Sequence, residues 1–229
     1  MDHAKFPKRA VIFDIDGVLI DSYDAHLQSW QQVAKRSDRE ISEKDFANTF
    51  GRTSREIIRQ LWENATLSDL DVEAFDQQKE AVFRAIVSAH YPWMDGAREL
   101  ISALSAADFY LAVGSSGPRE NVEVLLRQLG ATHPIAVAVS GSDVLHGKPH
   151  PEVFQRAAEK LKIPAGNCAV IEDAAAGITA ANAAGMLSIG LVSTGHERSE
   201  YAEADHVVSH LSELSADRIG RWIDASAGV

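Results

Sequence analysis

Two aspartates near the start of the sequence, Asp14 and Asp16, are well placed to do chemistry. They follow a short apolar run at 10–13, and residues i and i+2 of an extended segment point the same way, so the two carboxylates can converge. Crowded carboxylates repel each other unless a divalent cation, a shared proton or a cationic partner separates them. The pair therefore predicts an acidic site that needs positive charge, while an ordinary turn through Gly17 is the structural alternative.

A calcium-binding loop is another interpretation of this Asp-x-Asp-Gly pattern. Such a loop follows a helix and ends in a glutamate that binds the ion. If the loop starts at Asp14, Ala25 occupies that last position. The calcium interpretation therefore fails.

A second candidate segment contains Ser115, Ser116 and Gly117, after an apolar run at 110–113 and before a helical period that starts near Pro118. A phosphate at this place would meet a hydroxyl group, backbone N–H groups and the positive end of a helix dipole. Capping of the helix by Ser116 or Gly117 is the alternative, and both roles can coexist.

Lys148 is the third candidate, and it stands between Gly147 and Pro149. An exposed lysine in a turn is the alternative interpretation of this tripeptide. Next to Asp14, its ammonium group would offset the negative charge of a carboxylate and of a phosphoryl group.

Glu172 and Asp173 form the fourth candidate, directly after the apolar run at 169–171. Carboxylate oxygens are suitable ligands for Mg²⁺, which keeps several of its waters. Acidic residues also occur in first helical turns, where they complement the dipole. We expect Asp173 to be a metal ligand and Glu172 to be a ligand or a partner of a metal-bound water.

The residues after position 95 alternate between short apolar runs and helical periods, which predicts an α/β fold with a parallel sheet between helices, a Rossmann-like three-layer core. The expected strands lie at 10–13, 110–113, 135–139, 168–171, 187–191 and, at one edge, 206–208. Open parallel sheets bind ligands at the carboxyl ends of their strands, beside the point where the strand order reverses. All four candidate segments follow such strand ends.

Residues 21–92 differ from the rest, because they show helical periods and no convincing buried strand. The strand at 10–13 needs partners, and those begin near residue 110. We therefore expect a discontinuous catalytic core at 1–20 and 93–229, interrupted by a helical cap domain at 21–92, with hinges near 21–22 and 93–96.

Composition narrows the possible partners. The 22 basic and 33 acidic residues give a net charge of −11, which argues against binding to nucleic acid or to an anionic membrane surface. The sequence contains no apolar stretch long enough to span a bilayer and no signal peptide, so a cytoplasmic location is expected. The single cysteine, Cys168, is expected to be a buried structural thiol.

Together the four segments resemble the haloacid dehalogenase superfamily in order, spacing and strand placement, across residues 9–215. The resemblance implies phosphoryl transfer through an aspartyl phosphate, with Mg²⁺ as cofactor. The implied catalytic residues are the nucleophile Asp14, the general acid and base Asp16, and the two groups Ser115 and Lys148. The metal ligands that it implies are Asp14, Asp16, Glu172 and Asp173.

The helical insertion after the first motif resembles the subgroup that contains β-phosphoglucomutase and phosphoglycolate phosphatase. This likeness implies that the substrate is contacted by His26, Gly51, Arg55 and Lys79, and the strand-end segment adds Ser116 and Gly117 as candidate contacts of its phosphate. The alternatives are that His26 is an ordinary core or surface residue and that Arg55 pairs with a neighbouring acid on a solvated face.

Three functions follow as hypotheses. The first is a Mg²⁺-dependent phosphatase acting on a small phosphorylated metabolite, such as a sugar phosphate or a phosphoglycolate-like compound, as a monomer or weak dimer. The second is a phosphosugar mutase of the β-phosphoglucomutase type. The third is a non-catalytic, phosphate-responsive binding protein, against which the retained Asp16 argues.

Overall fold

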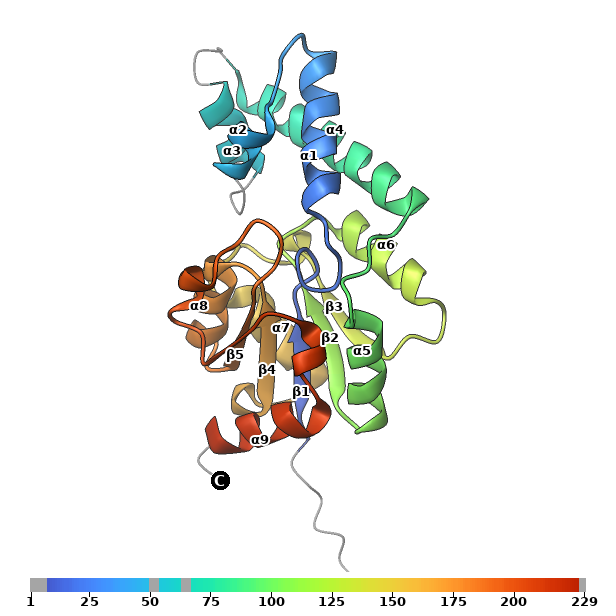
Figure 1. The fold of residues 1–229 in the computed structure, drawn as a ribbon, viewed down its shortest axis with the longest axis vertical. Helices are drawn as coiled ribbons and strands as arrows, with labels where there is room; N and C mark the ends of the chain where they lie inside the picture. The colour runs from blue at the N-terminus through green and yellow to red at the C-terminus, as the bar shows by residue number, and fades with distance from the viewer. Residues whose placement is uncertain (1–7, 50–53, 63–66, 227–229) are drawn as a thin grey trace, which may run out of the picture. The chain divides into compact units, whose positions relative to one another are not determined.

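The chain divides into two compact units in the computed structural model, which describes residues 8–49, 54–62 and 67–226. The first unit, hereafter the sheet unit, consists of Met1–Asp21 and Trp93–Val229. The second, hereafter the helical unit, is Ser22–Pro92. Both can be followed by colour in Figure 1.

The sheet unit is built on one parallel sheet, as the alternating sequence pattern predicts. Its strands run in the order β3-β2-β1-β4-β5-β6, and every neighbouring pair is parallel. The strands are β1 (Ala10–Phe13), β2 (Tyr110–Gly114), β3 (Ile135–Val139), β4 (Cys168–Glu172), β5 (Leu187–Leu191) and β6 (His206–Val208). Because chain order reverses between β1 and β4, the switch point lies at the carboxyl ends of these two strands.

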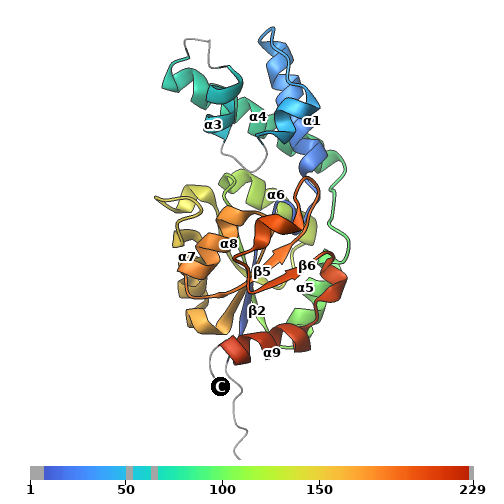
Figure 2. The same cartoon turned by 60° about the vertical axis from the view of Figure 1, so that its left-hand side comes forward.

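Helices cover both faces of this sheet, which gives the expected three layers. Helices α7 and α8 pack together on one face, and α5 and α9 pack together on the other (Figure 2). The helices of this unit are α5 (Ala97–Ala106), α6 (Arg119–Leu129), α7 (Glu152–Leu161), α8 (Ala175–Ala183) and α9 (Ala216–Ser226). Short 3₁₀ turns are η1 (Gly141–Asp143), η2 (Ala165–Asn167), η3 (Arg198–Tyr201) and η4 (Leu211–Glu213).

Strand β1 is central and fully buried, which explains why its four residues are all apolar. Ile12 lies in register between Ala112 of β2 and Val170 of β4, and all three side chains are 0% exposed. Alternate residues of a strand point to opposite faces, so β1 needs apolar side chains on both sides. The strand thereby holds the residue that follows it, Asp14, in a fixed place.

The single cysteine is the buried structural thiol that the sequence predicts, and a glycine follows the end of α8. Cys168 is buried in β4, and burial raises the pKa of its thiol to about 12, so it is an inert structural residue. Gly185 has φ +72° directly after the last turn of α8, a backbone conformation that glycine adopts without strain.

The helical unit contains α1 (Tyr23–Arg36), α2 (Glu43–Ala47), α3 (Ser54–Leu61) and α4 (Asp69–Ala89). Helix α4 begins with a capping box in which Ser68 and Asp71 each bond the other's backbone N–H. A separate apolar cluster around Trp30, Phe46 and Trp62 forms the core of the helical unit. Across the described parts of both units, no helix is long and apolar enough to cross a membrane.

Candidate active site

The turn after β1 brings Asp14 to the switch point. The Asp14 N–H donates to the Ile171 carbonyl of β4 at 2.9 Å, so Asp14 continues the strand pairing and is only 6% exposed. The chain then turns at Gly17, which has φ +70° and donates its N–H to the Ile20 carbonyl at 2.8 Å. A side chain at Gly17 would overlap the Asp173 carboxylate, so the turn requires glycine for its conformation and for the space it leaves.

Lys148 comes from the loop before α7 and joins two of the four predicted segments. Its Nζ donates to Asp14 Oδ1 at 2.5 Å, to Glu172 Oε1 at 2.5 Å and to the Gly114 carbonyl at 3.1 Å. Burial alone would lower the pKa of Lys148, but the Asp14 and Glu172 carboxylates outweigh it and raise this pKa above its ordinary value. Lys148 is therefore a fixed positive charge between two buried carboxylates, and not an exposed lysine in a turn.

Glu172 is held from several sides. Its Oε2 accepts the backbone N–H groups of Asp173 and Ala174, both at 2.9 Å, while Oε1 faces Lys148. A side chain at Gly177 of α8 would overlap the Glu172 carboxylate. These contacts hold the Glu172 carboxylate in place. In turn, Glu172 orients Lys148 and the first residues of the turn before α8.

Asp173 lies beside Glu172 and is 6% exposed. Its Oδ2 accepts the Ser193 hydroxyl at 2.8 Å, and the Tyr201 hydroxyl donates to its backbone carbonyl at 2.5 Å. Burial and the charges of Glu172 and Asp14 raise the pKa of Asp173, which the Ser193 hydrogen bond opposes.

One carboxylate oxygen from each of Asp14, Glu172 and Asp173 lies within 4.8 Å of the other two, close enough to hold one ion. Burial raises the pKa of Asp14 to about 7, with Glu172 and Asp16 adding to the effect and Lys148 opposing it. Lys148 is one ammonium among three buried carboxylates, so the group is short of positive charge. An all-oxygen donor set with surplus negative charge fits Mg²⁺.

Asp16 lies outside this group of three, and its side chain is partly exposed. Its charge still raises the pKa of Asp14 and of Asp173. The structure thus separates the two aspartates of the first motif by environment: Asp14 is buried with Lys148, whereas Asp16 is closer to solvent.

Ser115 follows β2 and is 2% exposed. Its N–H donates to the Val139 carbonyl at 3.0 Å, and its hydroxyl accepts the Gly117 N–H at 3.0 Å, so that N–H is already engaged. Ser116 is exposed. Pro118 is the N-cap of α6, which starts one residue later than the sequence pattern predicts. Because Gly114 contacts Lys148, this strand end adjoins the acidic group.

The helical unit brings two of the other predicted residues together. Lys79 Nζ lies 2.8 Å from His26 Nδ1 and 2.6 Å from Glu80 Oε1, and the His26 ring stacks on Phe83 with centroids 4.1 Å apart. Arg55 is exposed, and its guanidinium group lies 3.7 Å from the Asp69 carboxylate. This is the surface ion pair that the alternative interpretation of Arg55 predicts. Gly51 lies outside the described residues.

Sequence reasoning missed three residues that shape the acidic group: Ser193, Tyr201 and Gly177. Ser193 follows β5, so its place at the carboxyl edge of the sheet was an available signal. Tyr201 and Gly177 act through packing and a backbone contact, which a sequence pattern does not reveal.

The acidic group and the buried Lys148 lie at the switch point of an α/β sheet, where such folds bind their ligands. A sequence profile described as "Hydrolase: haloacid dehalogenase-like hydrolase" matches residues 8–185. The chain belongs to this family and is an enzyme, which leaves the non-catalytic hypothesis without support.

Relatives with assigned functions include phosphatases and a mutase. The chain is 31% identical to validoxylamine A 7'-phosphate phosphatase of Streptomyces hygroscopicus subsp. limoneus over 93% of its length and 98% of that protein. It is 26% identical to β-phosphoglucomutase of Bacillus subtilis, over 91% of its length and 92% of the relative. The family, together with its phosphatase members, supports the activity of a phosphoric monoester hydrolase for this chain.

The fold also matches solved structures along nearly the whole chain. A crystal structure of a haloacid dehalogenase hydrolase, family IA, variant 3, from Entamoeba histolytica superposes with a TM-score of 0.83 at 26% identity. The superposition covers 94% of this chain and 99% of that one.

Proposed function

We propose that this protein is a Mg²⁺-dependent phosphatase that hydrolyses a small phosphorylated metabolite, a sugar phosphate or a phosphoglycolate-like compound, through an aspartyl phosphate. The observation that carries the proposal is Lys148, whose Nζ lies 2.5 Å from both Asp14 and Glu172. A nucleophilic carboxylate must be ionised beside an anionic substrate, and a fixed ammonium group favours both conditions.

In the first step an Asp14 oxygen attacks phosphorus in line, and the bond between phosphorus and the leaving oxygen breaks. Asp16 gives its proton to the departing alcohol. In the second step Asp16 takes a proton from water, the water attacks phosphorus, and the bond to Asp14 breaks to release inorganic phosphate. The half-exposed setting of Asp16 suits a group that must meet both alcohol and water.

Ser115 and Lys148 bind the oxygens of the transferring phosphoryl group in this scheme, and the Ser116 and Gly117 backbone supports Ser115. Mg²⁺ supplies further positive charge against the phosphoryl oxygens. Asp14 and Asp173 would hold this ion, with an oxygen of Asp16 as a further ligand and Glu172 as a ligand or a partner of a bound water.

The helical unit is proposed as a cap, residues 21–92, that selects the substrate. His26, Lys79 and Arg55 are its candidate contacts, together with Gly51. The support is chemical, because a lysine, an arginine and an imidazole can all bind phosphate or sugar hydroxyl oxygens.

Asp14→Asn tests the nucleophile with p-nitrophenyl phosphate and Mg²⁺. We expect kcat to fall by about 10⁴-fold or more, because the amide cannot attack phosphorus. Asp108→Asn is the matched control, since Asp108 is exposed and its positive φ suits asparagine. Hydrolysis by Asp14→Asn at the wild-type rate contradicts the proposal.

Asp16→Asn tests the division of labour between the two aspartates. The p-nitrophenolate group leaves without protonation, so this variant should still form the aspartyl phosphate and then hydrolyse it slowly. A burst of p-nitrophenolate followed by slow turnover supports the scheme. Equal loss of the burst and of turnover would assign Asp16 to the first step as well, or to metal binding.

A mutase is the second candidate, favoured by the His26–Lys79 contact and by the resemblance to β-phosphoglucomutase. Incubation with β-glucose 1-phosphate and a bisphosphate primer separates the two functions. Formation of glucose 6-phosphate supports the mutase, whereas free phosphate alone excludes it.

A further inference from the structure

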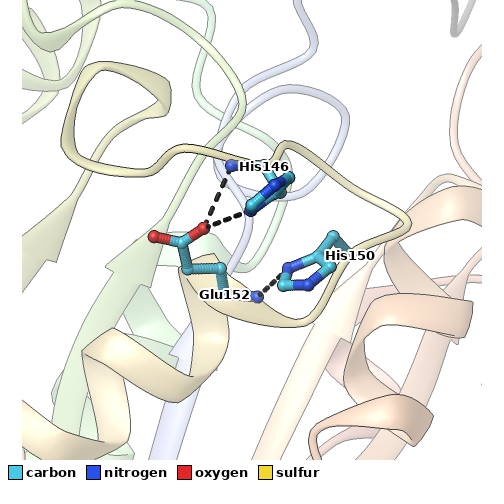
Figure 3. Close-up of side chains that lie close together, drawn as sticks. All are labelled: His146, His150 and Glu152. Atoms are coloured by element: carbon cyan, nitrogen blue, oxygen red, sulfur yellow. Dashed lines mark hydrogen bonds and ion pairs between the residues drawn. The ribbon is translucent and has the colours of Figure 1, made fainter.

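Two histidines and a glutamate gather beside the loop that carries Lys148, on the outside of the sheet unit. Figure 3 shows His146 and His150 in this loop and Glu152 in the first turn of α7. One ligand atom from each residue lies within 4.8 Å of the other two. The imidazole rings are 4.6 Å apart between centroids, and neither histidine nor the glutamate belongs to the phosphatase scheme.

Hydrogen bonds already shape this cluster. Glu152 Oε2 accepts the His146 N–H at 3.0 Å and lies 3.2 Å from His146 Nδ1. Glu152 Oε1 accepts the Arg156 Nε–H at 2.9 Å, which fixes the carboxylate along α7. The His150 Nδ1 accepts the Glu152 N–H at 3.3 Å, so its Nε2 is the nitrogen left for a ligand.

The cluster offers one ionised ligand, the Glu152 carboxylate, whose Oε1 also pairs with the Arg156 guanidinium at 2.7 Å and whose Oε2 faces His146. Burial acts against ionisation, but hydrogen bonds from the Leu145 and His146 backbone and from Arg156 hold the pKa of Glu152 at about 2. The carboxylate is therefore anionic at any physiological pH. Neutral imidazole rings each offer one lone pair, which makes histidine a common metal ligand.

The donor set distinguishes this cluster from the acidic group. Two nitrogens and one oxygen suit Zn²⁺ and similar transition metals, whereas Mg²⁺ prefers oxygen ligands alone. Zn²⁺ holds its ligands at about 2.0–2.2 Å, so tetrahedral ligand atoms lie about 3.4 Å apart. Ligand atoms that lie further apart than this must move together when the ion binds. His146, with 63% of its side chain exposed, has the freedom to move.

We propose that His146, His150 and Glu152 form a second metal site, which binds a divalent transition-metal ion of the Zn²⁺ type. Water completes the coordination, because three protein ligands leave an open position. Lys148 lies between the two histidines in the chain, so an ion at this site would fix the backbone on both sides of it. Zn²⁺ binding here does not depend on the proposed phosphatase chemistry.

Isothermal titration of the full chain with Zn²⁺, in saturating Mg²⁺, tests the site. Saturating Mg²⁺ competes with Zn²⁺ for the carboxylates of the acidic group and so reduces Zn²⁺ binding there. We expect wild-type protein to bind one Zn²⁺ with a Kd in the micromolar range. Binding, and not the rate of hydrolysis, is the readout, because Zn²⁺ can also displace Mg²⁺.

The variants decide where the ion binds. His150→Gln should raise the Kd at least about 10-fold, and the double variant His146→Gln with His150→Gln should abolish binding, since each removes an imidazole ligand. His90→Gln removes an exposed histidine of the helical unit and should bind as wild type does. Asp14→Asn should also keep this Zn²⁺.

Either of two results overturns the proposal. One is the absence of Zn²⁺ binding to the wild type in saturating Mg²⁺. The other is unchanged binding by the double variant, which would place the ion elsewhere. Both histidines are exposed, so the variants are expected to fold, and circular dichroism of each one checks this.

Discussion

Two buried lysines, Lys148 in the sheet unit and Lys79 in the helical unit, are held in different ways. Lys148 contacts two carboxylates at 2.5 Å, within a group of three buried acids. Lys79 contacts one carboxylate at 2.6 Å and one imidazole at 2.8 Å. It also lies 5.6 Å from the centre of the Trp30 ring and 5.3 Å from that of Phe83, where aromatic faces favour a cation.

The surroundings of the two lysines differ in their balance of charge. The site of Lys148 has more negative than positive charge, which disfavours folding unless a cation binds. A lysine with one carboxylate partner and two aromatic neighbours needs no added ion. We therefore expect Lys148 to act on the reacting phosphoryl group and Lys79 to act on the choice of substrate.

The largest expected effect comes from replacing each lysine by alanine. Lys148→Ala should lower kcat by about 10³-fold for every phosphate ester, because it removes charge stabilisation at the phosphoryl group. Lys79→Ala should leave p-nitrophenyl phosphate hydrolysis nearly unchanged and raise KM for a phosphorylated metabolite. Steady-state kinetics on both substrates measure this. Equal losses on p-nitrophenyl phosphate would end the distinction between the two lysines.

The surplus charge should also appear as a pH-dependent stability of the metal-free protein. Folded Asp14 keeps its proton up to about pH 7, whereas the unfolded carboxyl loses it near its ordinary pKa of 3.8. The folded state binds more protons between these values, so the free energy of unfolding must fall as pH rises from about 4 to about 7. The whole loss should be roughly 4 kcal/mol, of which roughly 3 kcal/mol falls above about pH 5, and Mg²⁺ should reverse it.

Urea unfolding in chelator at about pH 5 and about pH 8 measures this loss, with labelling of the buried Cys168 thiol as the signal for the core. Asp14→Asn is the comparison, because its amide does not titrate. A wild type and a variant with the same pH dependence would show that Asp14 is not the source.

Gly177→Ala tests whether the position of Glu172 matters. Alanine normally favours a helix by about 1 kcal/mol over glycine. Here the added carbon would overlap the Glu172 carboxylate and displace the partner of Lys148, so kcat should fall by about 10²-fold. Gly166→Ala is the matched control, because nothing lies within 4 Å of the added carbon. Similar kinetics for both variants would mean that the Glu172 carboxylate can move without changing kcat.

Ser193→Ala has the smallest expected effect. Its hydroxyl donates to Asp173 Oδ2 at 2.8 Å, and loss of such a partner of a metal ligand should weaken Mg²⁺ binding about 10-fold. Activity measured against Mg²⁺ concentration gives the change, with kcat at saturating Mg²⁺ nearly unchanged. Ser102→Ala, on the surface of α5, serves as control. An unchanged Mg²⁺ requirement would remove Ser193 from the metal environment.

The strands could be predicted because each buried parallel strand is a short apolar run between helical periods. Residues 10–13, 135–139 and 187–191 match the strands of the structure to the residue. The place of Ser193 after β5 could be predicted from the same pattern, but its hydrogen bond to Asp173 could not, because no local pattern shows which strand-end side chains meet. Candidate substrate contacts in the helical unit are harder still to predict, because a lone histidine or arginine has no periodic signal.

The sequence by itself determined the class of fold and the residue types at the strand ends, because hydrophobic periodicity and turn chemistry are local properties. Only the tertiary structure decided which of these residues meet. Lys148 and Asp14 are 134 positions apart, and their contact depends on the strand order that places β1 beside β2 and β4. Burial, and with it the raised pKa of Asp14, also arises only when the sheet and its helices exclude water from the strand ends.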